Sequence, residues 1–229
     1  MIWTKIKTKG KTAHGSMPYL GDNAINKLLR VIKSVKKIEE QRLNIPEDLT
    51  DVLKSSTNYL LEDKDLSKDK KEEVKRLFYH PTVSLNLLRG GVKTNIVPDY
   101  AQSEIDIRLT PVVDFAKIEK KIQDLIDETN IDDVTIEFQK GKGYYEPPNT
   151  KFTQQLSETV QIVTSSTPIY KVLTGGTDAI SLRWISNIPC LGFGVGPRGQ
   201  AHAPNEYTSI ENMVMVSKVY AIFPYIFNP

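Results

Sequence analysis

The first residues of the chain alternate between side chains of two kinds. Even-numbered positions from Ile2 to Thr8 are apolar or carry a hydroxyl group, and lysines stand between them at positions 5, 7 and 9. A period of two residues is typical of a β-strand with one face in water. Segments 82–91, 95–111 and 133–141 are rich in β-branched and alternating apolar residues, so we expect strands there as well.

Two other segments repeat their apolar residues at helical spacing. One stripe runs from Ile25 to Val35 after Asp22, which is able to cap a helix, and another runs through residues 114–129. With Gly90-Gly91 as a hairpin-type connection, the order is strand, helix, strand, strand, helix, strand. This order predicts a ferredoxin-like βαββαβ domain, an α+β layer pair that is able to fold alone.

The rest of the chain predicts an insertion and a second domain. Residues 41–80 have mixed charges and scattered apolar residues, which indicates short inserted helices, and the Gly- and Pro-rich stretch 141–149 is typical of a boundary. We therefore divide the chain into residues 1–142 and 143–229. In the second part we expect helices at 152–163, 179–184 and from residue 210, and strands at 168–173 and 190–195. This is an α/β pattern, but two strands make a poor sheet, so an apolar face should be exposed or covered by a partner.

Composition and charge narrow the classes of function. A formal net charge of +2 over 229 residues does not indicate the excess of basic residues that is typical of proteins that bind nucleic acid or an anionic membrane. No stretch approaches the roughly 20 apolar residues that span a bilayer, and no signal peptide is visible, so we expect a cytoplasmic location. Cys190 is the only cysteine, which excludes an internal disulfide, and a core side chain is favoured over a nucleophile. Because the chain starts directly in a strand, we expect it to be a piece of a longer protein.

The loop GPRGQAHAPNEY at 196–207 carries the most distinctive chemistry. It follows an expected strand and precedes an expected helix, which is where α/β folds place ligands. His202 is a possible metal ligand that Glu206 is able to orient, but the two residues are equally able to cap and solvate the helix. These residues alone leave both interpretations open.

Four segments together resemble a known family. They read GKTAHGSMPYLGDNAI, RGGVKTNIVPDYAQSEIDIR, TGGTDAI and GPRGQAHAPNEY, in this order and spacing. They are similar to the second half of the dinuclear-zinc amidohydrolases and exopeptidases, which include aminoacylase, acetylornithine deacetylase, succinyl-diaminopimelate desuccinylase and carboxypeptidases. The resemblance implies a ferredoxin-like lid or dimerisation domain at 1–142, and the C-terminal portion of an incomplete α/β zinc-peptidase catalytic domain at 143–229.

The resemblance also implies roles for single residues. His202 matches the last metal ligand of the family, and His14 matches the lid histidine that polarises the scissile carbonyl in the partner subunit. The residues that match contacts to the substrate, mainly to its carboxylate, are Asn95, Arg108, Gly175, Gly176, Thr177 and Asn205. Three simpler roles stay open: Arg108 pairs with Asp106 on a strand surface, Asp178 caps a helix, and Gly90-Gly91 is only a turn.

The chemistry of this family requires groups that the chain does not contain. Two zinc or cobalt ions, a bridging carboxylate and a glutamate base belong mostly to the N-terminal half of the family, and no His-x-Asp motif occurs here. We therefore expect part of a zinc-dependent hydrolase of N-acyl amino acids or small peptides, inactive without the missing N-terminal half. The chain would then be a truncated gene product, a product with a wrongly assigned start at Met1, or one half of a split enzyme whose other half is a separate polypeptide. The alternative is a non-catalytic dimerisation or scaffold module. In either case the lid should form a homodimer.

Overall fold

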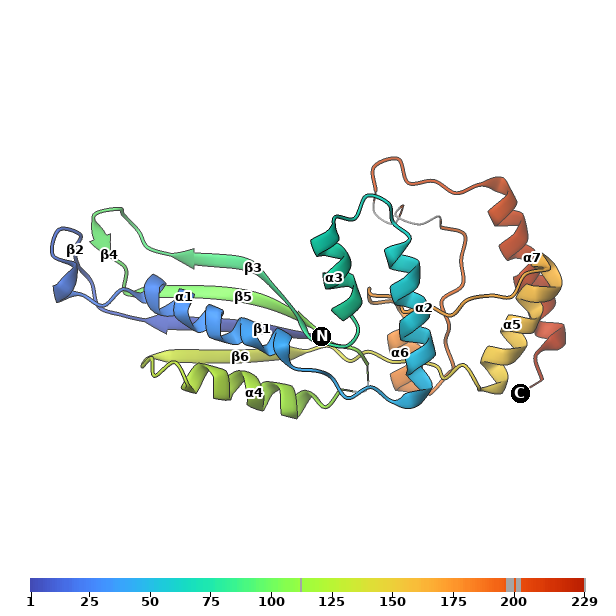
Figure 1. Cartoon of the computed structure of the whole chain (residues 1–229), viewed down its shortest axis with the longest axis horizontal. Coiled ribbons are helices and arrows are strands. Elements are labelled where there is room, and N and C mark those ends of the chain that lie inside the picture. The colour runs from blue at the N-terminus through green and yellow to red at the C-terminus, as the bar shows by residue number, and fades with distance from the viewer. Residues whose placement is uncertain (112, 197–199, 201–202, 229) are drawn as a thin grey trace. The chain divides into compact units, whose positions relative to one another are not determined.

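The computed structural model describes residues 1–111, 113–196, 200 and 203–228, and it divides the chain into two compact units (Figure 1). The first unit comprises residues Met1–Pro46 and Leu61–Gly143, and the second comprises Glu47–Leu60 and the residues from Tyr144 onwards. The third crossing between the units, at Gly143/Tyr144, lies next to the expected boundary at 142. Residues 47–60, which we expected to be an insertion within the first domain, group with the second unit. The domain division proposed from the sequence stays a prediction.

A four-stranded antiparallel sheet forms the centre of the first unit. Its strands stand in the order β3-β5-β1-β6 and comprise Thr82–Gly90 (β3), Tyr100–Arg108 (β5), Ile2–Lys9 (β1) and Val134–Lys140 (β6). The expected strand period is confirmed in β1, where Ile2, Thr4, Ile6 and Thr8 are buried. The register pairs Ile6 with Ser103 of β5 and with Ile136 of β6, so apolar and small side chains meet on one face.

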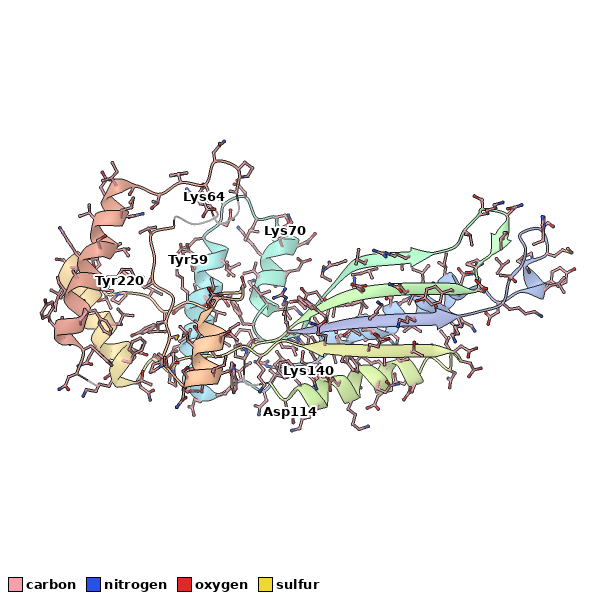
Figure 2. The ribbon with its side chains drawn as sticks, turned by 180° about the vertical axis from the view of Figure 1, so that it is seen from behind. Tyr59, Lys64, Lys70, Asp114, Lys140 and Tyr220 are labelled. Carbon is pink, nitrogen blue, oxygen red and sulfur yellow. The ribbon has the colours of Figure 1, made fainter. Side chains whose placement is uncertain are left out.

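Two helices cover that buried face. α1 (Ala24–Val35) packs on β1 and β5 and contacts α4 (Phe115–Asp127), as Figure 1 shows. Figure 2 labels Asp114, the N-cap of α4, whose carboxylate accepts a hydrogen bond from the Ala116 N–H at 3.0 Å, and Lys140 at the end of β6. The expected cap of α1 is wrong by one residue: Asn23 accepts from the Asn26 N–H at 3.1 Å, whereas Asp22 forms an ion pair with Lys27.

The opposite face of the sheet is polar. Its side chains include ion pairs between Lys5 and Glu104 and between Lys7 and Glu137. Alternation of apolar and charged residues along β1 therefore separates a face in contact with helices from a face in water.

The connection between β3 and β5 is more than the simple hairpin that we expected. Residues 91–99 contain a short strand, β4 (Ile96–Val97), which pairs with β2 (Ala13–His14) in a separate two-stranded ribbon. Gly91 has a φ of +77°, a left-handed value that favours glycine. A Cβ atom on Gly90 would lie 2.9 Å from Ile25 Cγ1, so glycine allows α1 to approach this end of β3.

The remaining elements of the first unit are short. They are two 3₁₀ helices, Pro18–Leu20 (η1) and Lys36–Glu40 (η2), and one α-helix, Lys68–Arg76 (α3).

Within the described residues, the second unit is built from helices. They comprise Glu47–Leu49 (η3), most of Thr50–Leu61 (α2), Lys151–Thr164 (α5), Ala179–Ser186 (α6) and Ile210–Ile226 (α7). α5 packs against α7, where the rings of Phe152, Phe223 and Phe227 lie with their centroids 5.3–5.9 Å apart. The expected strands at 168–173 and 190–195 are wrong, because neither segment pairs with a strand in the described residues.

The second unit leaves many apolar side chains in solvent. Ile185, Tyr225, Ile210 and Ile169 are 84%, 91%, 75% and 68% exposed. Cys190, expected in a core strand, is only partly buried. Among the described residues, no helix is long and apolar enough to cross a membrane.

Candidate functional site

The β2–β4 ribbon brings together two of the predicted site residues. His14 on β2 stands opposite Ile96 on β4, and the Gly15 N–H donates to the Asn95 carbonyl at 2.7 Å. A Cβ atom on Gly15 would lie 3.1 Å from the Asn95 carbonyl carbon, so glycine permits this close approach. His14 and Asn95, which are 81 positions apart in the sequence, are thus neighbours at this ribbon. Figure 1 shows β2 and β4 at one end of the four-stranded sheet.

The hydrogen bonds of His14 define which ring nitrogen faces outward. The Ser16 backbone N–H donates to His14 Nδ1 at 3.2 Å, and the Ser16 hydroxyl lies 2.7 Å from the same atom. Because Nδ1 accepts the backbone bond, the neutral ring carries its proton on Nε2. The exposed His14 side chain therefore has an N–H donor on Nε2, a type of group that is able to stabilise negative charge on an oxygen.

Arg108 lies at the other end of the sheet. β5 extends for eight residue steps from Tyr100, just after the ribbon, to Arg108, or roughly 26 Å at 3.3 Å per residue. Arg108 Nε and Nη2 donate to Asp106 Oδ2 at 3.0 and 2.7 Å, which is the surface pair that the sequence left open. Arg108 therefore cannot share one substrate with His14 and Asn95 of the same unit, and its role as a carboxylate ligand stays a prediction.

The predicted carboxylate loop, Thr174–Thr177, lies exposed in the second unit just before α6. No atom lies within 4 Å of a Cβ atom placed on Gly175, so the backbone of the loop is open to an approaching ligand. Burial raises the pKa of Tyr144, and the nearby Thr177 side chain acts in the opposite direction. Asp178 occupies the N-cap position of α6, but its side chain makes no capping hydrogen bond.

Two predicted residues belong to the loop before α7. Asn205 is exposed and has a φ of +58°, a conformation that asparagine adopts more readily than most residues. His202 lies outside the described residues. Both assignments therefore stay predictions.

The described residues do not by themselves fit a zinc site. Among them, no group of three or more His, Cys, Asp or Glu side chains is placed to hold a metal ion. Structural and catalytic zinc ions take at least three protein ligands. A dinuclear centre would need ligands from outside the part of the chain that the structure describes.

The sequence patterns missed a buried ion pair that holds α6. Glu146, whose side chain is 3% exposed, lies 2.9 Å from Arg183 Nε and accepts a hydrogen bond from the Cys190 N–H at 3.2 Å. The Gly- and Pro-rich composition of residues 141–149 predicts only a domain boundary. The available signal was that Glu146 is the only acidic residue in that stretch.

Comparison with known proteins defines the class. Residues 1–134 match the M20 peptidase dimerisation domain, and this match covers more than half of the chain. The chain therefore belongs to the M20 peptidase dimerisation domain family. It carries a dimerisation domain, and the resemblance stated from the sequence motifs is confirmed.

The curated relatives extend the similarity beyond that domain. The chain is 28% identical over 211 residues to a probable succinyl-diaminopimelate desuccinylase of Staphylococcus aureus strain MRSA252, covering 89% of the chain and 50% of the relative. It is 29% identical over 146 residues to a probable carboxypeptidase of Talaromyces marneffei, covering 62% of the chain and 27% of the relative. The chain spans about half the length of the desuccinylases that it matches.

Solved structures share the fold. The M20 family metallo-carboxypeptidase Sso-CP2 from Sulfolobus solfataricus matches with a TM-score of 0.70 at 18% identity, over 97% of this chain and 57% of the other. The di-peptidase Dug1p from Saccharomyces cerevisiae gives a TM-score of 0.67 at 16% identity, over 98% and 53%. The mixed α/β fold with its four-stranded antiparallel sheet is therefore the fold of this family.

Proposed function

We propose that this chain is the lid and the C-terminal portion of the catalytic domain of a zinc-dependent amide hydrolase, which acts on N-acyl amino acids or small peptides. The observation that carries the proposal is the exposed His14, whose Nδ1 accepts the Ser16 N–H, on the same β2–β4 ribbon as Asn95. A neutral imidazole N–H and a carboxamide are suitable donors for the oxygen of a scissile amide as charge develops on it. The names of the relatives, a desuccinylase and a carboxypeptidase, support this class of substrate.

We also infer that the first unit is a ferredoxin-like lid. Numbered along the chain, the four long strands stand in the order 2-3-1-4, and both long helices cover one face. This arrangement supports the βαββαβ topology expected from the sequence. The ribbon that carries His14 is an addition at one end of that sheet.

The lid is proposed to form a homodimer through the region of β3. This strand is at the edge of the sheet, and Leu85 and Leu88 point toward the helix side because they pair with Ile105 and Ser103. They are nevertheless 39% and 48% exposed. An edge strand with apolar side chains requires cover, and a second copy would provide it symmetrically.

The chain alone is proposed to be inactive, because its described residues contain no metal-ligating set. A bound zinc or cobalt ion would supply an activated water. The remaining ligands and the general base would come from a further polypeptide, together with His202. The non-catalytic scaffold is the second candidate, and the lack of a metal-ligating set among the described residues favours it as well.

The proposal is tested by assaying hydrolysis of N-acyl amino acids with zinc or cobalt. The chain is assayed alone and after mixing with a polypeptide that supplies the other half of the family's length. We expect activity only on mixing, and His14→Ala should lower kcat by about 10²–10³-fold, the typical loss of one oxyanion donor. His80→Ala, a histidine outside the ribbon, is the matched control. Activity of the chain alone would contradict the claim of incompleteness, and inactivity of both would favour the scaffold.

A further inference from the structure

The inserted helix α2 is attached to a segment of the second unit that pairs with no strand. The Val172 N–H donates to Ser56 Oγ at 2.8 Å, and Lys171 Nζ lies 3.6 Å from the centroid of the Tyr59 ring. Figure 2 shows Tyr59 on α2, within the same unit. The neighbouring residues Lys171 and Val172 are therefore held by two side chains that lie one turn apart on α2.

Ser56 is itself fixed in place. Ser56 is only 3% exposed, and its hydroxyl donates a hydrogen bond to the Val52 carbonyl at 2.6 Å. Because the hydroxyl proton is used within the helix, a lone pair of the oxygen is free to accept the Val172 N–H. Leu53, one turn earlier, is fully buried and anchors the same face of α2.

These contacts bear on the loop at 174–177, which begins two residues after Val172. The space around Gly175 is open, whereas Thr177 at the end of the loop interacts with the Tyr144 side chain. After the loop, the chain is fixed by the Glu146–Arg183 ion pair on α6. Before the loop, the Ser56–Val172 bond provides the corresponding anchor, in a segment that pairs with no strand among the described residues.

We propose that Ser56 is a positioning residue for the loop Thr174–Thr177, acting through Val172. This inference rests on the proposed function and on the carboxylate-binding role that the family resemblance implies for this loop. In the sequence, residues 47–60 are preceded and followed by residues of the first unit. The anchor is therefore contributed by a segment that is inserted in the sequence of the lid.

Amide hydrogen exchange, followed by NMR on the whole chain, tests the anchor directly. In Ser56→Ala the Val172 amide loses its acceptor, and we expect its exchange to become about tenfold faster, with faster exchange also through residues 174–177. Ser55→Ala on the same helix is the matched control and should leave these rates unchanged, and Ser56→Thr, which keeps the hydroxyl, should preserve them. Unchanged protection in β1 and β5 shows that the variant is folded.

Binding of a carboxylate tests the role of the loop separately. N-acetyl-L-alanine should shift the Gly175 and Gly176 amide signals of the wild type, whereas N-acetyl-L-alanine amide should not. The apparent Kd for N-acetyl-L-alanine should rise several-fold in Ser56→Ala and stay unchanged in Ser55→Ala and Ser56→Thr.

The outcomes separate the two claims. Exchange at Val172 that is the same in Ser56→Ala and the wild type overturns the positioning inference, as does an equal acceleration in Ser55→Ala. An unchanged Kd in Ser56→Ala, where the wild type binds, also overturns it. A wild type whose glycine signals do not respond to the carboxylate overturns the proposed role of the loop, whatever the exchange rates show.

Discussion

The two units of this chain bury their apolar side chains to very different extents. In the first, residues from β1, α1, β5 and α4 form one continuous buried cluster that includes Ile6, Leu28, Ile105 and Ile122. In the second, the fully or nearly buried apolar residues are few, and side chains as large as Ile185 and Tyr225 are almost entirely in solvent. Since apolar burial is the main driving force of folding, the first unit has a core of its own and the second requires further cover.

The same difference is the basis for the contacts that we propose for each unit. The first unit exposes apolar residues mainly along one strand, β3, and around the β2–β4 ribbon, whereas the second exposes them over α6, α7 and the segments between helices. A restricted apolar edge suits a symmetric contact between two copies. A broad apolar surface suits the remainder of a domain, as the half-length coverage of the relatives supports.

The largest expected effect is on the core of the first unit. Ile122→Ala removes a fully buried side chain of α4 and should lower the free energy of unfolding by about 2–5 kcal/mol, measured by urea denaturation. Ile185→Ala, at a residue 84% exposed in the second unit, should change it by less than about 0.5 kcal/mol. Equal losses would remove the contrast between the units.

The proposed dimer contact should respond to a charge on one face of β3 only. Leu88→Lys places a charge on the helix side of the edge strand and should raise the dimer dissociation constant at least tenfold in analytical ultracentrifugation. Leu87→Lys is the matched control, because Leu87 pairs with Glu104 on the polar face. A monomeric wild type, or equal weakening by both variants, would contradict the assignment.

Helix caps provide a smaller test in the same two units. Asp114→Ala removes the side-chain acceptor for the Ala116 N–H and should cost about 1 kcal/mol. Asp178→Ala should cost less than about 0.5 kcal/mol, because Asp178 makes no side-chain cap bond. Thermal unfolding of the two variants measures the difference, and a larger loss in Asp178→Ala would show that the cap of α6 forms after all.

The smallest effect concerns the polar face of the sheet. The hydrogen bond from Lys7 lowers the pKa of Glu137 below its ordinary value of 4.5. A lowered pKa means that this contribution to stability is complete above the unfolded-state pKa and is lost as the pH falls through the folded-state pKa. Glu137→Gln should therefore flatten the acid limb of a stability–pH curve slightly. A steeper acid limb in Glu137→Gln would contradict the sign.

Sequence patterns predicted the first unit well because its signals are local. The period of two in β1 and the helical stripes of α1 and α4 reflect burial against neighbours that the chain itself provides. The cap of α1 differed by one residue, since Asp22 pairs with Lys27 and leaves Asn23 to cap. The ribbon of β2 and β4 was missed because two-residue strands have no period to detect.

Prediction of the second unit failed where structure depends on distant partners. Segments 168–173 and 190–195 have the composition of buried strands, but a strand forms only beside another strand, and no strand of the described residues pairs with either segment. Likewise, no periodicity reveals that Ser56 of the insertion contacts Val172, 116 positions later. For the site, family motifs indicated His14 and Asn95 but not their hydrogen bonds through Ser16 and Gly15.

We propose that this chain holds only part of a dinuclear metal centre. Titration of the purified chain with zinc, followed by calorimetry and by metal analysis after dialysis, measures this directly. We predict that the chain alone binds fewer than two zinc ions tightly, and that two ions per chain are retained only with the complementary polypeptide. Two tightly bound zinc ions on the chain alone would contradict the account.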